Sequence, residues 1–250
     1  MKWLIILTLA LPFKSLAQGL QGTIAYEYLY AAQWDKAIRS YNFSRPFLEE
    51  KQPLLVHGGS VGGAYLFNRP KRLKFGIELS FSSFRSKASN GGLTNVIRAE
   101  LIRAGLVLHY HDHKKAKGIF GELMIGPVMS TMSRAVDRER ILLDDERLRT
   151  FGVGGEVAAR VGYGFFTKKR LALAPFVSIS FIPYLYDPRS EIVLNQTQGL
   201  VSERSTIALS AQLGMHFKVL PKQKALGSGI LGMPPNITTP KAAPSDRLLP

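Results

Sequence analysis

The chain of 250 residues contains no cysteine and carries 33 basic against 18 acidic side chains, for a net charge of +15. Without cysteine it has no disulfide framework, no thiolate nucleophile, no cysteine-ligated metal site and no cysteine for lipid attachment. So large a positive charge is typical of nucleic-acid-binding proteins. The N-terminus indicates export, however, so we expect anionic lipid headgroups as the counter-charge and no nucleic-acid partner.

The N-terminus has the pattern of a secretory signal peptide. Lys2 precedes an apolar run over residues 4–13, and residues 15–17 place small side chains where a signal peptidase reads them. An uncleaved anchor is the alternative, but Pro12 and Lys14 interrupt the run, which is shorter than the roughly 20 apolar residues of a transmembrane helix. We therefore assign residues 1–17 to a signal peptide and expect no transmembrane helix in the mature chain.

Most of the remaining chain alternates apolar residues with small or polar ones. The alternation is strict over residues 150–165, where one parity is mostly large and apolar and the other holds Gly, Ala, Glu156 and Arg160. A period of two predicts a β-strand with one apolar face. Eight segments fit this pattern, in chain order 19–30, 55–68, 72–84, 96–110, 118–132, 150–165, 170–186 and 205–219.

The connections between these segments alternate in length. Those at 31–54, 85–95, 133–149 and 187–204 are long, and those at 68–72, 111–118 and 167–170 are short. Membrane barrels have an even number of antiparallel strands, short periplasmic turns and longer external loops. We therefore predict an all-β fold: an eight-stranded antiparallel transmembrane β-barrel over residues 18–220, with long external loops, in the cell outer membrane.

A soluble lipocalin-like barrel with its apolar residues inside is the alternative fold. Its outward face would be Gly, Ser, Ala and a few charges, which is an unusual surface in water but suits the narrow interior of an eight-stranded barrel. Aromatic residues near both strand ends also favour a membrane, where rings lie at the headgroups. They are Tyr28, Tyr30, Phe81, Phe151 and Tyr184 at the outer end, and Phe67, Phe75, Tyr110, Phe165 and Phe217 at the periplasmic end.

The alternation stops after residue 219. Residues 221–250 are rich in Pro, Gly and Lys and have little apolar surface to bury. Such a segment cannot offset the entropy of ordering, so we predict a disordered periplasmic tail.

Six charged residues fall on the inward parity of the predicted strands. Neighbouring strands place Glu78 with Arg103 and Glu122 with Arg160, and buried charges are costly unless paired. We expect a structural ion network in the lumen; a proton or ion path, or an acid–base pair of carboxylates, is the alternative. The six are Glu27, Glu78, Arg103, Glu122, Glu156 and Arg160.

The short turns are strongly basic and predict a periplasmic basic rim that contacts lipid phosphates or an acidic partner. Three histidines beside one turn, His109, His111 and His113, alternate in strand fashion, but the nearby sequence offers no acidic or cysteine co-ligand, so we predict no metal and no cofactor. The rim consists of Arg69, Lys71, Arg72, Lys114, Lys115, Lys117, Lys168, Lys169 and Arg170.

The first connection, 31–54, is far longer than a hairpin requires. Trp34, Ile38 and Tyr41 are spaced i, i+4, i+7, which predicts a short amphipathic helix over residues 33–41. Aromatic and arginine residues dominate binding hot spots, so this connection is a candidate docking segment; a lid over the barrel's own mouth is the alternative. The candidate residues are Trp34, Arg39, Tyr41, Phe43, Arg45 and Phe47.

No catalytic motif accompanies this pattern. His57 and Ser60 are close in sequence, but a spacing of three places them on opposite faces of a strand. We therefore expect no enzymatic activity, and a lipid-modifying hydrolase or acyltransferase is the alternative.

The signal-peptide end Ser15-Leu16-Ala17, the long alternating strands and the segment 33–47 resemble small outer-membrane barrels of Bacteroidota, among them the PorT-like and PorP/SprF-like proteins. That resemblance implies a role in secretion across the outer membrane or in gliding. We accordingly predict a non-enzymatic scaffold or docking component of the cell envelope, with outer-membrane lipids as partners and a protein partner at the 31–54 connection or the basic rim.

Overall fold

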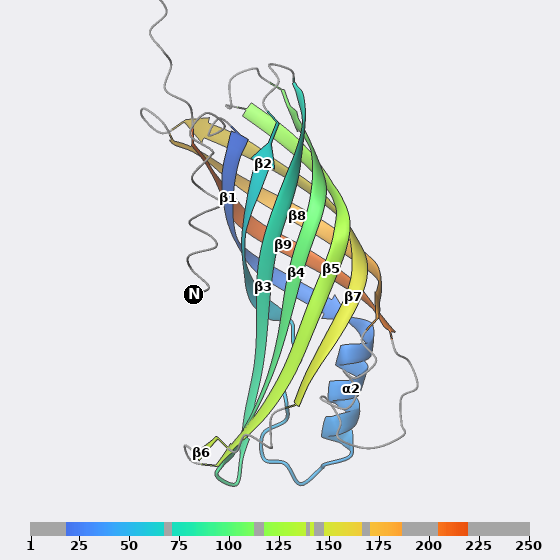
Figure 1. Cartoon of the computed structure of the whole chain (residues 1–250). Helices are drawn as coiled ribbons and strands as arrows, with labels where there is room; N and C mark the ends of the chain where they lie inside the picture. Colours follow the sequence, from blue (N-terminus) through green and yellow to red (C-terminus); the bar gives the residue numbers. More distant parts are fainter. Residues whose placement is uncertain are drawn as a thin grey trace, which may run out of the picture.

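The computed structural model describes residues 19–67, 72–112, 118–138, 141–142, 148–166, 171–186 and 205–219. Within them, eight long antiparallel strands follow one another around a closed barrel, because β4 pairs with β5 and β1 pairs with β9 (Figure 1). The predicted eight-stranded antiparallel barrel is therefore confirmed, whereas the proposed signal peptide and tail lie outside the described residues. The strands are β1 (Leu20–Ala31), β2 (His57–Leu66), β3 (Leu73–Asn90), β4 (Leu93–His111), β5 (Gly118–Arg138), β7 (Leu148–Phe166), β8 (Leu171–Tyr186) and β9 (Ser205–Val219); the short β6 (Ile141–Leu142) pairs with the end of β5.

The outward face of the barrel is a continuous apolar belt. On β3 every second residue from Leu73 to Phe81 is an exposed large hydrophobic. The other strands alternate in a similar way, although β2 has Gly59 and Gly63 at outward positions. An exposed apolar surface of this extent has no place in water, and closed barrels are one of the two structures that can span a bilayer. The belt excludes the lipocalin-like alternative and places the chain in the outer membrane.

One helix, α2 (Ala32–Phe43), lies at one end of the barrel, which is called the helix end below (Figure 1). In the described part of the chain, no helix has the length and apolar character needed to cross a membrane.

The sheet of β3, β4 and β5 continues beyond the apolar belt at the helix end (Figure 1). Phe81, Ile102 and Met129 share one register row and are the last exposed large apolar residues on the outward face of these strands. The long loop predicted at 85–95 is therefore wrong, because β3 and β4 run on to a tight turn at Gly91 and Gly92, whose φ values are 55° and 77°. Most outward residues there are polar, so the alternation that marks a membrane strand is lost.

Strands β5 and β7 likewise extend into the predicted 133–149 connection. The predicted loop is wrong over those strand residues for the same reason: beyond the belt, a strand no longer needs an apolar outward face.

Strands β4 and β5 approach closely in the middle of the belt. The register pairs Arg103–Val128 and Leu106–Ile125 flank a stretch where Gly126 faces the β4 backbone. A Cβ on Gly126 would lie 2.0 Å from the carbonyl oxygen of Ala104, so only glycine fits.

Gly126→Ala should therefore destabilise the barrel by about 1–3 kcal/mol, the usual cost of overpacking. Heat-modifiable gel migration after refolding across a urea series measures this loss. Gly121→Ala on the same strand is the control, since its Cβ would meet only the Arg160 carbonyl oxygen at 4.0 Å. Equal midpoints for the two variants would show that the strands can separate at Gly126 without cost.

Candidate functional site

Two buried arginines organise the charged side chains in the lumen. Arg103 on β4 lies between two carboxylates, with Nη2 2.5 Å from Glu27 Oε1 and Nε 3.0 Å from Glu156 Oε2. Glu27 also accepts hydrogen bonds from Ser82 Oγ at 2.6 Å and Gln212 Nε2 at 3.0 Å. Side chains from five strands thus meet around one guanidinium and fill this level of the lumen.

The second arginine, Arg160 on β7, also bridges two carboxylates. Its Nη1 lies 2.7 Å from Glu122 Oε2 and 3.0 Å from Glu78 Oε2, and its Nη2 donates to Glu78 Oε1 at 3.1 Å. Glu122 is contacted by two histidines as well, His109 Nδ1 at 2.7 Å and His216 Nε2 at 3.3 Å. Every carboxylate at this level therefore has a cationic or hydrogen-bonding neighbour, as burial requires.

All six predicted lumen residues are buried, but one predicted pair differs. Glu122 and Arg160 contact each other as expected, whereas Glu78 pairs with Arg160 and not with Arg103. In the β3–β4 register Glu78 is opposite Gly105 and Arg103 is opposite Ser80, so Arg103 lies two residues nearer the helix end. In a narrow barrel, side chains reach across the lumen, and strand adjacency does not decide the pairing.

The sequence interpretation missed the histidine contacts. His109 was considered as a metal ligand without an acidic neighbour, yet Glu122 on the adjacent strand supplies one, and His216 joins from β9. The signal was present, because both histidines share the inward parity of Glu122. Among the residues that the structure describes, no group of three possible ligands could hold a metal, and His113 lies outside them.

Thr23, His216 and Glu122 follow the order hydroxyl, imidazole, carboxylate found in nucleophilic triads. Thr23 Oγ1 is hydrogen-bonded to His216 Nδ1 at 2.8 Å. All three residues are buried, and the His216 ring stacks on Phe176 with centroids 4.3 Å apart. Their polar atoms therefore satisfy one another within the packed lumen and leave the hydroxyl without access to a substrate.

The other pair considered, His57 and Ser60, does point to opposite sides of β2. Ser60 is buried in the lumen, whereas His57 is exposed and stacks against Tyr26 on the outer surface. These two residues cannot act together.

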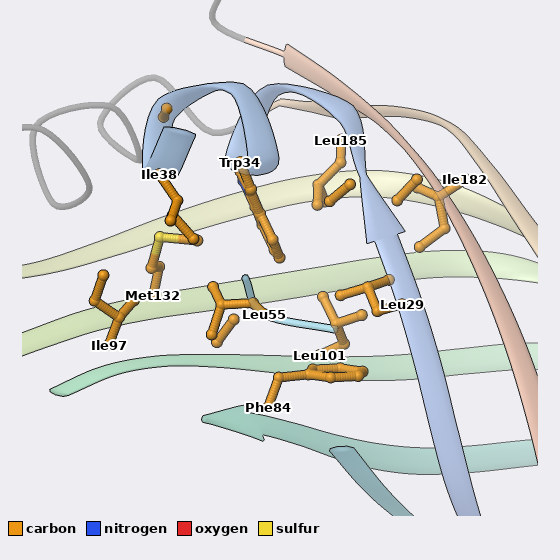
Figure 2. Close-up of a cluster of buried hydrophobic side chains, with 14 of the residues drawn as sticks. Leu29, Trp34, Ile38, Leu55, Phe84, Ile97, Leu101, Met132, Ile182 and Leu185 are labelled. Atoms are coloured by element: carbon orange, nitrogen blue, oxygen red, sulfur yellow. The ribbon is translucent and has the colours of Figure 1, made fainter. Parts of the chain in front are cut away.

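Helix α2 closes the mouth at the helix end. Figure 2 shows Trp34 and Ile38 pointing from the helix into the barrel, where Trp34 is 1% exposed. They belong to a buried cluster with side chains of the strand wall and of the segment that follows the helix, namely Leu29, Leu55, Phe84, Ile97, Leu101, Met132, Ile182 and Leu185. The predicted amphipathic helix is confirmed, and its apolar face packs into the barrel's own mouth.

Asp35 lies in the first turn of α2, which has no side-chain cap. A carboxylate there interacts favourably with the unpaired backbone N–H groups at the start of the helix. Burial raises the pKa of Asp35, and the positive charge of Arg39 partly opposes that rise.

Residues 44–56, which follow α2, are fastened to the β3–β4 hairpin; α2 and this segment are called the lid below. The side chain of Asn42 exchanges two hydrogen bonds with the backbone of Gln52, each 2.9 Å long. Gln52 in turn accepts from Asn95 at 3.0 Å, and Asn90 Nδ2 donates to the Glu50 carbonyl at 2.9 Å. The lid is therefore held by polar contacts at its rim as well as by the apolar cluster.

The residues of the predicted docking segment are partly buried and partly exposed. Trp34 and Tyr41 are buried, so including them in an exposed surface was wrong; the helical period turns both toward the mouth. Arg45 is partly buried and stacks on the Tyr41 ring at 4.2 Å. Arg39 is exposed, and Phe43, the last residue of the helix, and Phe47, just beyond it, are 90% and 77% exposed.

Of the predicted basic rim, the structure describes one residue, Arg72, which is exposed. The others lie outside the described residues: Arg69, Lys71, Lys114, Lys115, Lys117, Lys168, Lys169 and Arg170.

Comparison with known proteins gives similarity in fold. No protein-family model matches the chain, and no curated protein matches it. Among solved structures, the chain is similar to the attachment invasion locus protein Ail of Yersinia pestis, with 10% identity over 80% of this chain and 98% of Ail and a TM-score of 0.41. The chain is also similar to Neisserial surface protein A, with 10% identity over 80% of this chain and 95% of that protein and a TM-score of 0.40. For the outer membrane protease OmpT of Escherichia coli, the identity is 10% over 82% of this chain and 97% of OmpT, with a TM-score of 0.39. At this identity, no activity or partner passes from them to this chain.

Proposed function

We propose that this protein is a non-enzymatic outer-membrane scaffold that docks a protein partner through the tip of its lid, residues 43–47. The observation that carries the proposal is the exposure of Phe43 and Phe47 on a segment that the Asn42–Gln52 hydrogen bonds hold in place. Exposed rings on a preordered segment lose little entropy on binding, and Arg39 supplies a charge beside them.

The filled lumen favours a scaffold function and argues against a pore. Arg103 and Arg160 with their carboxylates occupy the middle of the barrel, and Trp34 and Ile38 occupy its mouth. Eight strands enclose just enough room for such side chains and leave no aqueous channel.

Three finer parts of the proposal rest on the sequence. The helix end faces the outside, because the connection between β1 and β2, residues 32–56, lies there and is far longer than a periplasmic turn. The basic rim at the other end contacts inner-leaflet phosphates or an acidic periplasmic partner. The resemblance to PorT-like and PorP/SprF-like proteins of Bacteroidota favours a docking role in secretion.

Photo-crosslinking in native outer membranes tests the docking surface. A photoreactive amino acid at position 47 should give one discrete protein adduct, and Phe43→Ser in the same chain should abolish it. The same probe at lipid-facing Ile77, which is also exposed, is the control and should give lipid adducts only. The absence of a protein adduct at position 47, or one that persists with Phe43→Ser, would overturn the proposal.

A further inference from the structure

Two arginines lie side by side on the outer surface, just beyond the apolar belt at the helix end. Arg85 on β3 is directly opposite Arg98 on β4, and both are exposed. The same register row continues through Ser133 on β5 to Arg149 on β7. Lys87 follows Arg85 on the same face of β3. Three of the four positions in this register row are therefore basic, and Lys87 adds a basic side chain next to it.

Like charges directly opposite each other on neighbouring strands are destabilising without an anion between them. No acidic side chain among the described residues forms an ion pair with Arg85 or Arg98. The nearest outward carboxylate in the sheet, Glu100, accepts a hydrogen bond from Thr131 at 3.1 Å. The two guanidinium groups are thus free to bind an anion from outside the chain.

The height of the row fits a lipid headgroup. Arg85 follows Phe81, the last apolar residue of the belt on β3, by four residues, or about 13 Å along the strand and roughly 10 Å along the membrane normal at a tilt of about 40°. The polar layer of a bilayer adds about 5–8 Å to each side of the hydrocarbon core. A guanidinium at Arg85 or Arg98 can therefore reach down to the phosphates of this leaflet.

We propose that Arg85 and Arg98 bind a phosphate of lipid A in the outer leaflet, which rests on the proposed outward orientation of the helix end. Guanidinium groups bind phosphate through paired charge-assisted hydrogen bonds. Neighbouring arginines on a rigid sheet preorder four such donors, and the apolar belt below them contacts the acyl chains of the same lipid. The site is separate from the lid tip, so it stands or fails independently of protein docking.

Native mass spectrometry of the full mature barrel in detergent, with added lipid A, tests this site. The ratio of lipid-bound to free protein should fall roughly tenfold for each arginine lost in Arg85→Gln and Arg98→Gln. Arg39→Gln, which removes an exposed arginine from the lid, is the control and should keep wild-type binding. Arg85→Lys with Arg98→Lys should bind at an intermediate level and guards against misfolding of the glutamine variants.

Two further ligands separate the lipid from its phosphate. Dephosphorylated lipid A should bind to the wild-type protein no better than intact lipid A binds to the double glutamine variant. Inorganic phosphate at the same concentration should not compete with lipid A, because it lacks the acyl contacts. Equal lipid A binding by wild type and the double variant, or equal binding of the dephosphorylated lipid, would overturn the proposal.

Discussion

Replacing Arg160 with alanine should lower the free energy of unfolding of the barrel by about 3–5 kcal/mol. The variant leaves Glu78 and Glu122 buried in the lumen without the guanidinium that contacts both. Urea unfolding in lipid vesicles, followed by heat-modifiable gel migration, measures the change. Arg39→Ala is the matched control: it removes an exposed arginine from helix α2 and should change the stability of the barrel by less than about 0.5 kcal/mol.

A triple variant separates pairing from packing. Arg160→Met with Glu78→Gln and Glu122→Gln removes the charges together while keeping similar volumes, and it should recover much of the loss. If Arg160→Ala alone unfolds at the wild-type urea concentration, the two carboxylates are solvated and the lumen is wetter than the buried contacts indicate.

Trp34→Ala should open the lid without unfolding the barrel. Removing a fully buried tryptophan typically costs about 3–5 kcal/mol, and here the loss falls on the packing of α2 into the mouth. Trypsin cleavage after Arg39 and Lys51, followed by mass spectrometry, should become much faster, since both bonds lie in the lid. The folded barrel should keep its heat-modifiable migration.

Phe43→Ala is the control for this experiment. It removes an aromatic side chain of the same helix that is exposed, so cleavage should stay at the wild-type rate. Unchanged cleavage in Trp34→Ala would mean that the polar contacts of Asn42, Gln52 and Glu50 hold the lid without the apolar cluster.

The barrel could be predicted from the sequence because a membrane strand alternates apolar residues that face lipid with small or polar residues that face the lumen. On β3, the alternation from Leu73 to Phe81 marks both the strand and its lipid-facing side. Beyond Phe81 the outward residues meet water, the contrast between the faces fades, and the strand was taken for a loop. Inward residues such as Phe84 kept the period, but one small or apolar face alone is a weak signal.

The candidate site was harder to predict because its contacts cross the lumen. Parity correctly placed Glu78 and Arg103 inside, yet which charges meet depends on strand tilt and on reach across the barrel. The lid shows the same limit, since the helical spacing of Trp34 and Tyr41 predicts an apolar face but not the surface that covers it. That surface comes from Phe84, Leu101 and Met132, far along the chain.

The seam between β1 and β9 has a consequence for biogenesis. Register pairs from Gln21–Lys218 to Ala31–Ala208 join the first strand to the last, and the Thr23–His216 hydrogen bond spans 193 residues of sequence. Contacts so distant along the chain form late in folding. Until β9 has crossed into the periplasm, the free edge of β1 is an exposed template for pairing with another chain. The time at which β9 arrives therefore sets how long each newly exported molecule stays open to aggregation and in need of a chaperone.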